Sequence, residues 1–319
     1  MRIYAAPLQG ITTCLFRALH ARMFGGVDRY FAPFLSPAPE HLLTERELRD
    51  LSPDRNDLSR TVPQIMTRRS ADFRWAAETL YGLGYDEVNL NLGCPAGTVT
   101  AKGKGSGFLL HPKELDVFLN DIFAALPDRS ISVKTRLGYR EAAEFPRLAE
   151  IYSRYPIREL TVHPRVRQDF YSGTPRWDAL EAALPSLPMP VCCNGDLVTV
   201  RDCRAIASRF PGASALMLGR GLMADPALAR KLQGGPDASR EELDRFTAAL
   251  YEGYQELYGP GPAAYRMKEL WYYLIHLFDG GEKIARKMCR VSKPWEYETL
   301  RAEIFQTLPL CREPAGSLE

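Results

Sequence analysis

Cys94 is the first residue whose type and position suggest chemistry. It follows the alternating run EVNLNLG (residues 87–93), so its thiol stands at the end of a predicted strand. A loop with four glycines and two lysines comes next, namely Gly97, Lys102, Gly103, Lys104, Gly105 and Gly107. Such a loop could act as a mobile lid, and its thiol could protonate or attack a substrate. The alternatives are a small buried cysteine and a solvated basic loop.

Two glycine-containing motifs could bind phosphate. One consists of Asn194, Gly195 and Asp196, the other of Gly219, Arg220 and Gly221, and each follows a predicted strand. Glycine lets backbone N–H groups approach an anion, and a guanidinium can donate two hydrogen bonds to phosphate oxygens. Either motif alone could be a tight turn, but their position after two consecutive strands favours phosphate binding.

Lys134 alternates with the apolar residues Ile131 and Val133 inside a predicted strand. His163 ends a predicted strand whose other residues are apolar. A lysine that points into a barrel mouth would suit an anion or an electron-rich ring, although its side chain could instead extend to the rim. A single histidine is more often a hydrogen-bonded structural group than a ligand or base. The residues alone therefore leave the role of His163 open.

The elements that must position these residues follow a regular alternation. The predicted strands cover 3–9, 29–36, 62–66, 87–93, 131–138, 159–165, 190–197 and 215–221, and the helical segments between them include 71–84, 112–126 and 142–155. Eight strands alternating with helices predict an α/β fold, the TIM (β/α)8 barrel, whose active site lies at the carboxyl ends of the strands.

A different pattern begins after the barrel. The run QGGPDASREEL (233–243) predicts a linker, and Ser239 with Glu242 forms a capping-box pair. Helices are expected near 240–258, 262–278, 282–291 and 296–307. We therefore expect a catalytic barrel over residues 1–235 and a small all-helical domain over 240–319.

Composition excludes several classes of protein. Of the 319 residues, 45% are hydrophobic and 25% charged, which is typical of a soluble globular chain. No apolar run suits a membrane helix and no signal peptide is evident, so we expect a cytoplasmic protein. Seven cysteines without a Cys-x-x-Cys pair argue against a secreted disulfide scaffold and against a zinc or iron–sulfur site.

Charge is informative only locally. The net charge of +2 says nothing about nucleic acid. However, seven basic residues follow strand ends: Lys102, Lys104, Arg136, Arg140, Arg165, Arg167 and Arg220. In a barrel these would share one face, and a single cofactor phosphate needs only one or two of them. The excess predicts a polyanionic partner.

The motifs together resemble those of the tRNA-dihydrouridine synthases. The sequence contains the following motifs in the same order as that family: APLQGITTCLFR, NLNLGCPAGTVTAKGKGSGFLL, VKTRLG, LTVHPRVRQDFYSG, CNGDL and LMLGRG. A fainter match lies in RMKELWYYL (266–274). The resemblance implies an FMN-binding barrel that reduces the C5=C6 bond of a specific D-loop uridine in tRNA to 5,6-dihydrouridine. NADPH (or NADH) would reduce the flavin, flavin N5 would give hydride to C6, and Cys94 would protonate C5.

The resemblance also implies roles for residues. Flavin contacts would come from Pro7, Leu8, Gln9, Gln64, Lys134 and His163, and phosphate contacts from Asn194, Gly195, Asp196, Gly219 and Arg220. Asn91 would hold the uracil, and the RNA would lie against Lys102, Lys104, Arg136, Arg165 and Arg167. Two departures from the family pattern could alter the pocket or the choice of uridine: Leu8-Gln9, where Met and a small or acidic residue are usual, and Pro164, where Gly is usual.

The predicted C-terminal helices resemble the family's tRNA-binding domain. Lys283, Arg286, Lys287 and Arg290 fall on one helical stripe, which is a candidate tRNA contact or an ordinary solvated face. Other functions stay open: a flavin barrel acting on a small free pyrimidine, an enoate or a non-tRNA RNA, and a non-catalytic RNA-binding module. We expect a monomer that binds tRNA, without a metal or a membrane.

Overall fold

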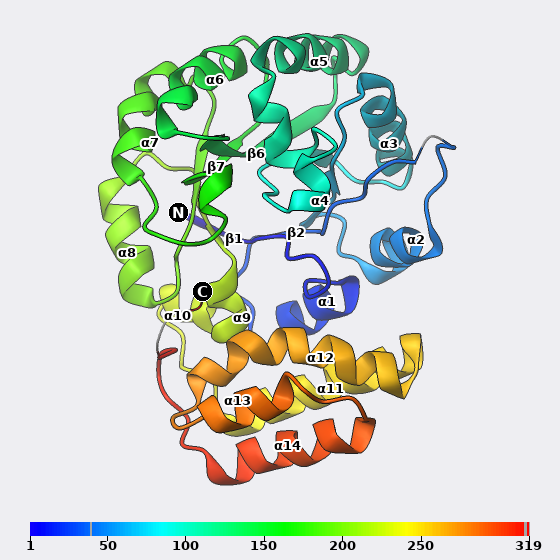
Figure 1. Ribbon diagram of the computed structural model, residues 1–319, viewed down its shortest axis with the longest axis vertical. Helices are drawn as coiled ribbons and strands as arrows, with labels where there is room; N and C mark the ends of the chain where they lie inside the picture. Colours follow the sequence, from blue (N-terminus) through cyan, green and yellow to red (C-terminus); the bar gives the residue numbers. More distant parts are fainter. Residues whose placement is uncertain (39, 316–317, 319) are drawn as a thin grey trace.

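The barrel is built from short parallel strands (Figure 1). The computed structural model describes residues 1–38, 40–315 and 318. Within these residues nine strands form one sheet in the order β3-β2-β1-β9-β8-β7-β6-β5-β4. They are β1 (Arg2–Ala5), β2 (Arg29–Phe31), β3 (Thr61–Val62), β4 (Gln64–Ile65), β5 (Glu87–Leu92), β6 (Ser130–Gly138), β7 (Leu160–Val166), β8 (Val191–Asn194) and β9 (Ala215–Leu218). Because β3 and β4 are consecutive, the sheet is nearly closed, which confirms the predicted TIM barrel.

The predicted third strand (62–66) is divided into β3 and β4 by Pro63. Proline has no N–H to donate and cannot continue a hydrogen-bonded ladder. As a result β3 pairs with β2, whereas β4 pairs with β5. Leu35 N donates to Gln64 O (2.8 Å), and Met66 N donates to Leu35 O (2.9 Å). These bonds tie β4 to the segment after β2 and complete the closure.

The barrel interior is apolar on one side and polar on the other. A separate apolar cluster inside it consists of Tyr4, Ala6, Phe31, Val62, Cys192, Ala215 and Met217. Strands β4 to β7 instead contribute buried polar side chains, namely Gln64, Asn89, Asn91, Ser132, Thr161 and His163. The alternate residues of the same strands, such as Leu90 and Val133, belong to the core between sheet and helices. The polar half of the interior leads up to Cys94.

Helices surround the barrel (Figure 1). They are α1 (Cys14–Met23), α2 (Glu45–Leu51), α3 (Ser70–Gly82), α4 (Gly97–Thr100), α5 (Pro112–Ala125), α6 (Phe145–Tyr152), α7 (Trp177–Ala183), α8 (Val200–Arg209), α9 (Arg220–Ala224) and α10 (Leu228–Leu232). The helices α3, α5 and α6 correspond to those predicted at 71–84, 112–126 and 142–155. Across the described residues, no helix has the length and apolar character needed to cross a membrane.

The C-terminal helices pack against one side of the barrel (Figure 1). They are α11 (Arg240–Tyr258), α12 (Pro260–Leu274), α13 (Glu282–Met288) and α14 (Pro294–Thr307). As predicted, Ser239 caps α11 by accepting a hydrogen bond from Glu242 N. Phe246 packs edge-on against Phe16 of α1 and against Phe24, which directly follows α1, with ring centroids 5.7 Å and 5.1 Å apart. The core of this helical region is therefore continuous with the outer core of the barrel.

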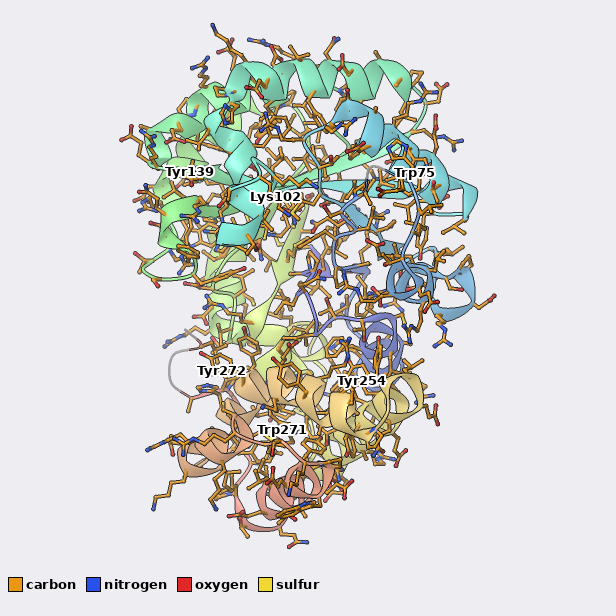
Figure 2. The ribbon with its side chains drawn as sticks, turned by 45° about the vertical axis from the view of Figure 1, so that its right-hand side comes forward. Trp75, Lys102, Tyr139, Tyr254, Trp271 and Tyr272 are labelled. Atoms are coloured by element: carbon orange, nitrogen blue, oxygen red, sulfur yellow. The ribbon has the colours of Figure 1, made fainter. Side chains whose placement is uncertain are left out.

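Figure 2 shows where aromatic residues of this region lie. Trp271 stands among the C-terminal helices, whereas Tyr254 and Tyr272 stand toward the barrel. Trp271 is 1% exposed, and its Nε1 donates to the Tyr297 hydroxyl oxygen (3.4 Å). The Tyr254 hydroxyl lies 3.0 Å from Thr13 Oγ1, in the cap of α1. The barrel and the helical region are thus joined by polar as well as apolar contacts.

Candidate active site

Cys94 lies at the barrel mouth, directly after β5. The turn is held by Asn91, whose Oδ1 accepts hydrogen bonds from Gly93 N (3.0 Å) and Cys94 N (2.9 Å). Burial raises the pKa of the Cys94 thiol, and this effect outweighs the opposing charges of Arg136 and Lys134. Cys94 is therefore a protonated thiol at neutral pH, and it can serve as a proton donor.

The glycine-rich segment (residues 95–110) is folded against Cys94. It contains α4 and a following 3-10 turn. Ser106 donates from N (3.1 Å) and from Oγ (2.8 Å) to the carbonyl oxygen of Cys94. A Cβ atom on Gly107 would lie only 2.7 Å from the carbonyl oxygen of Thr100. This glycine therefore permits close packing, where the sequence suggested mobility.

Lys134 points into the barrel. Its Nζ donates to Asn194 Oδ1 (2.8 Å), and Asn194 Nδ2 donates in turn to Met217 O (2.8 Å). Burial, with a further contribution from the Arg136 charge, lowers the pKa of Lys134 to about 8. In the described part of the chain, no carboxylate is among the groups that act on this charge. An anion beside Nζ would therefore stabilise the charged form of Lys134.

His163 is a neutral imidazole in this arrangement. Arg165 Nη1 lies 3.0 Å from His163 Nε2. Because a guanidinium can only donate, Nε2 must accept, and the ring proton is assigned to Nδ1. Burial, followed by the charges of neighbouring cations, lowers the pKa of His163 well below its ordinary value. His163 can therefore donate a hydrogen bond through Nδ1, but it is no acid at neutral pH.

Asp196 joins two arginines. Its carboxylate accepts two hydrogen bonds from Arg165 (2.8 Å and 2.6 Å) and one from Arg220 (2.7 Å). The backbone at Asp196 is left-handed (φ 47°), and Gly195 before it has φ 135°. A Cβ on Gly195 would lie 2.9 Å from His163 Cδ2, so glycine is needed at this approach. The Asp196 carboxylate is thus engaged by the two guanidinium groups.

The basic residues do not form the single exposed surface that the sequence suggested. Arg136 and Arg165 are 1% and 0% exposed. Arg136 donates to Gly93 O and Val166 O, both at 2.9 Å. These two arginines are buried because strands β6 and β7 direct them inward, toward carbonyl groups and Asp196. They organise the site from inside and offer no outer face to a polyanion.

The remaining basic residues lie closer to solvent. Lys102 and Arg140 are exposed. Lys104 Nζ donates to Ser36 Oγ (2.9 Å), and Arg167 Nη2 donates to Thr100 Oγ1 (3.2 Å). Figure 2 shows Lys102 on the same side of the barrel as Tyr139, which follows β6. Lys102 and Arg140 are thus the members of the predicted set most accessible to a partner.

Lys134 and the basic residues that lie closest to it fit an anionic cofactor. Lys134, Arg136, Arg165 and Arg220 bring four positive charges to the barrel mouth. In the described chain, Asp196 is the carboxylate that forms ion pairs with two of them. Partly buried positive charge without a partner is unfavourable, and an anion would compensate it. An anionic cofactor therefore suits this set of cations.

Residues predicted to contact the ring occupy different places. Pro7 and Leu8 are half-buried after β1, and Leu8 packs against the interior cluster. Both amide atoms of Gln64 are already used, since Nε2 donates to Asn89 and Oε1 accepts from Asn91. Gln9 is exposed and lines a separate cavity of about 50 Å³ between α2 and the C-terminal helices.

Tyr171 is a site residue that sequence reasoning missed. Its ring lies 5.3 Å from Arg136 Cζ, 5.4 Å from Arg220 Cζ and 6.3 Å from the His163 ring. It covers the cationic cluster from a loop after β7. No periodicity marks a loop residue, and the only available signal was its place in the motif LTVHPRVRQDFYSG.

The predicted basic stripe lies far along the chain from this cluster. Its members are Lys283, Arg286, Lys287 and Arg290, all exposed. Arg286 also lines a cavity of about 400 Å³ among the C-terminal helices. Among the residues described, no group of three or more His, Cys, Asp or Glu side chains is arranged to hold a metal ion.

Comparison with solved structures supports the barrel. An old yellow enzyme homologue from Zymomonas mobilis superimposes with a TM-score of 0.56 and 14% sequence identity, over 75% of this chain and 90% of that one. At this identity the likeness concerns the fold alone.

Comparison with protein sequences is more specific. The tRNA-dihydrouridine synthase B of Yersinia pestis is 30% identical over 288 residues, which are 86% of this chain and 87% of the relative. A probable tRNA-dihydrouridine synthase 1 of Synechocystis is 29% identical over 97% of this chain and 88% of its own length. The family model described as dihydrouridine synthase matches residues 4–283. The chain therefore belongs to the dihydrouridine synthase family.

Proposed function

We propose that this protein reduces the C5=C6 bond of a uridine in tRNA to 5,6-dihydrouridine, with FMN as cofactor and NADPH as reductant. The observation that carries the proposal is a protonated thiol, Cys94, beside a buried cationic cluster at the mouth of a barrel of this family. The names of the relatives in Yersinia pestis and Synechocystis support tRNA as the substrate.

FMN would be held by residues at the barrel mouth, above the buried polar side chains. When bound, it would supply hydride to C6 of the uracil. Lys134 and the Nδ1–H of His163 would donate to the ring or its phosphate, and Arg220 with the backbone at Gly195 and Gly219 would contact the phosphate. Lys134 would also stabilise negative charge on the ring.

Cys94 would complete the reduction by giving its proton to C5. Burial favours the thiol over the thiolate, so the proton is available near neutral pH. Asn91 would position the turn that carries the thiol, because it accepts hydrogen bonds from both Gly93 N and Cys94 N. The thiolate that remains would be stabilised by the nearby Arg136 and Lys134 charges, which oppose the effect of burial on the pKa of Cys94 without reversing it.

The first experiment is product formation in unmodified tRNA with purified protein, FMN and NADPH, followed by mass mapping of dihydrouridine. Wild-type protein should modify a D-loop uridine, and Cys94→Ala should bind FMN yet form almost no product. Cys94→Ser should behave in the same way, because a hydroxyl is a far weaker acid than a thiol. Wild-type product yield in either variant would refute the proton-donor role.

The control for these variants is Cys289→Ser. This cysteine is exposed in the C-terminal region and should be dispensable. Absence of product with every tRNA, together with turnover of free uridine or an enoate, would favour a small-molecule reductase. RNA binding without any turnover would instead favour a non-catalytic module.

A further inference from the structure

A row of buried polar side chains runs beneath Cys94. It consists of Ser132 on β6, Asn89 and Asn91 on β5, and Gln64 on β4. Gln64 and Asn89 are 0% exposed, Ser132 is 1% and Asn91 is 7% exposed. Buried amide groups are costly unless they are hydrogen-bonded, so each bond in this row constrains the next.

The bonds of the row all run in one direction. Asn89 Nδ2 donates to Ser132 Oγ (2.9 Å), and Gln64 Nε2 donates to Asn89 Oδ1 (2.8 Å). Asn91 Nδ2 donates to Gln64 Oε1 (2.7 Å). Each amide therefore turns its N–H2 group toward Ser132 and its oxygen toward Cys94.

The last oxygen of the row determines the turn. Asn91 Oδ1 accepts from Gly93 N and Cys94 N, and it can do so only while its N–H2 group faces Gln64. If the amides were reversed, the Asn91 N–H2 group would face two backbone donors, which is repulsive. The orientation of the whole row is thus matched to the backbone from which the Cys94 side chain projects.

We propose that Asn89 and Ser132 are positioning residues for the Cys94 thiol, acting through Gln64 and Asn91 without touching substrate or cofactor. The proposal rests on the proposed function in that Cys94 must be the proton donor. A shift of the thiol by about 1 Å is enough to slow a positioned reaction severely. Loss of the row should therefore slow the protonation step and leave cofactor binding intact.

The decisive variant is Asn89→Leu, compared with Asn89→Asp. Leucine has a similar volume but provides no acceptor for Gln64. Aspartate keeps the acceptor for Gln64, and the Ser132 hydroxyl can donate to its second oxygen. The bond to Ser132 then reverses, but the direction of the bonds from Gln64 to Cys94 is preserved. We expect Asn89→Leu to slow reoxidation of the reduced flavin by tRNA about 10-fold or more. Asn89→Asp should restore the rate to within a few-fold of wild type, and Ser132→Ala should lie between the two.

Two further measurements separate positioning from general damage. Reduction by NADPH and the FMN dissociation constant should change less than twofold in Asn89→Leu. The pH profile of Cys94 alkylation by iodoacetamide should shift, because the thiol environment changes; this needs no substrate and remains informative if tRNA is the wrong substrate. The matched control is Thr161→Val, which removes a hydroxyl from β7 in the same interior and should match wild type.

Three results would overturn the proposal. The first is an Asn89→Leu protein with wild-type reoxidation rate and alkylation profile. The second is equal loss of flavin binding and reoxidation in Asn89→Leu and Asn89→Asp, which would mean that the row only supports the fold. The third is a Thr161→Val protein as slow as Asn89→Leu. If wild type forms no dihydrouridine but the alkylation profiles still differ as expected, the proposed function fails and the positioning of Cys94 stands.

Discussion

Burial shifts the pKa values of two side chains at the barrel mouth in opposite directions. Burial raises the pKa of Cys94 and lowers that of Lys134 to about 8. In both cases burial favours the neutral form of the side chain over the charged form, as expected for groups removed from water. An anion bound between them would restore the charge of Lys134 and raise the pKa of Cys94 further. The site therefore suits an anion next to a neutral acid.

The pKa of Lys134 predicts how cofactor affinity depends on pH. Below about pH 8 the flavin-free protein already carries the ammonium group, so FMN affinity should be constant. Above it, binding must recharge the amine, and affinity should fall by up to about 10-fold per pH unit. Lys134→Met should bind FMN more weakly at pH 7 and show no such fall. Fluorescence titration between pH 7 and 9.5 measures both proteins, with the exposed Lys113→Met as control.

The same shift has a consequence for stability. The folded-state pKa of Lys134 lies below its ordinary value, so the charge destabilises the flavin-free fold fully below about pH 8. This penalty disappears as pH rises toward the ordinary lysine pKa. Flavin-free Lys134→Met should therefore melt at a higher temperature than wild type at pH 7. A pH-independent affinity together with an unchanged melting temperature would show that Lys134 is not a buried cation.

Single residues differ in how far the sequence predicts them. Alternation in β6 correctly placed Lys134 inside the barrel, since Val133 and Thr135 face the other way. The same alternation also directs Arg136 inward, but a long basic side chain could have reached solvent. Its burial depends on carbonyl groups of Gly93 and Val166, which only the folded barrel brings within 2.9 Å.

At the scale of elements, a glycine-rich segment can be either a mobile loop or a closely packed one, and the sequence alone does not distinguish the two. In residues 95–110 the glycines suggested a mobile lid. In the structure Gly107 is buried and touches the backbone of Thr100, while Ser106 is bonded to Cys94 O. Contacts between residues distant along the loop decide the outcome, and composition carries no information about them. The division of a strand at Pro63, by contrast, follows from one residue type.

Close packing in this segment predicts an effect of adding one methyl group. Gly107→Ala would place a Cβ 2.7 Å from the Thr100 carbonyl oxygen, and backbone atoms cannot move aside cheaply. We expect a loss of about 1–3 kcal/mol, as for other overpacked sites, and faster hydrogen exchange at Ser106. The control is Gly97→Ala, whose Cβ would come no closer than 4.0 Å to Arg167 Nη2. Equal exchange rates in the two variants would mean that the segment is open in solution.

At the scale of the whole molecule, the helical C-terminal region and the barrel share one continuous hydrophobic core. The sequence predicted the helices well, because capping and amphipathic patterns are local. It predicted a linker and a small all-helical domain after the barrel. The contacts of Phe246 with Phe16 and Phe24 add that the cores of the two parts are continuous. These contacts join residues more than 200 positions apart, and no local pattern encodes them.

A continuous core predicts a single cooperative unfolding transition. Phe246→Ala should lower the free energy of unfolding by about 3–5 kcal/mol, the range for truncating a buried phenylalanine. It should do so without separating a barrel transition from a helical one. Calorimetry with fluorescence of Trp271 in the C-terminal helices and of Trp75 in α3 would follow the two parts (Figure 2). Two resolved transitions in wild type would show instead that the parts fold independently.

The exposed basic stripe allows a test of whether the C-terminal region binds tRNA. It is formed by Lys283, Arg286, Lys287 and Arg290. If it binds tRNA, changing all four residues to Glu should weaken tRNA binding and lower the salt slope of affinity by about 1 for each phosphate that is no longer neutralised. Reoxidation at saturating tRNA should stay near wild type, because the reacting groups lie at the barrel mouth. Changing the exposed Arg201 and Arg204 of α8 to Glu controls for charge reversal elsewhere on the surface, at half the change in net charge. An unchanged salt slope, or an equal decrease in this control, would assign the stripe to an ordinary solvated face.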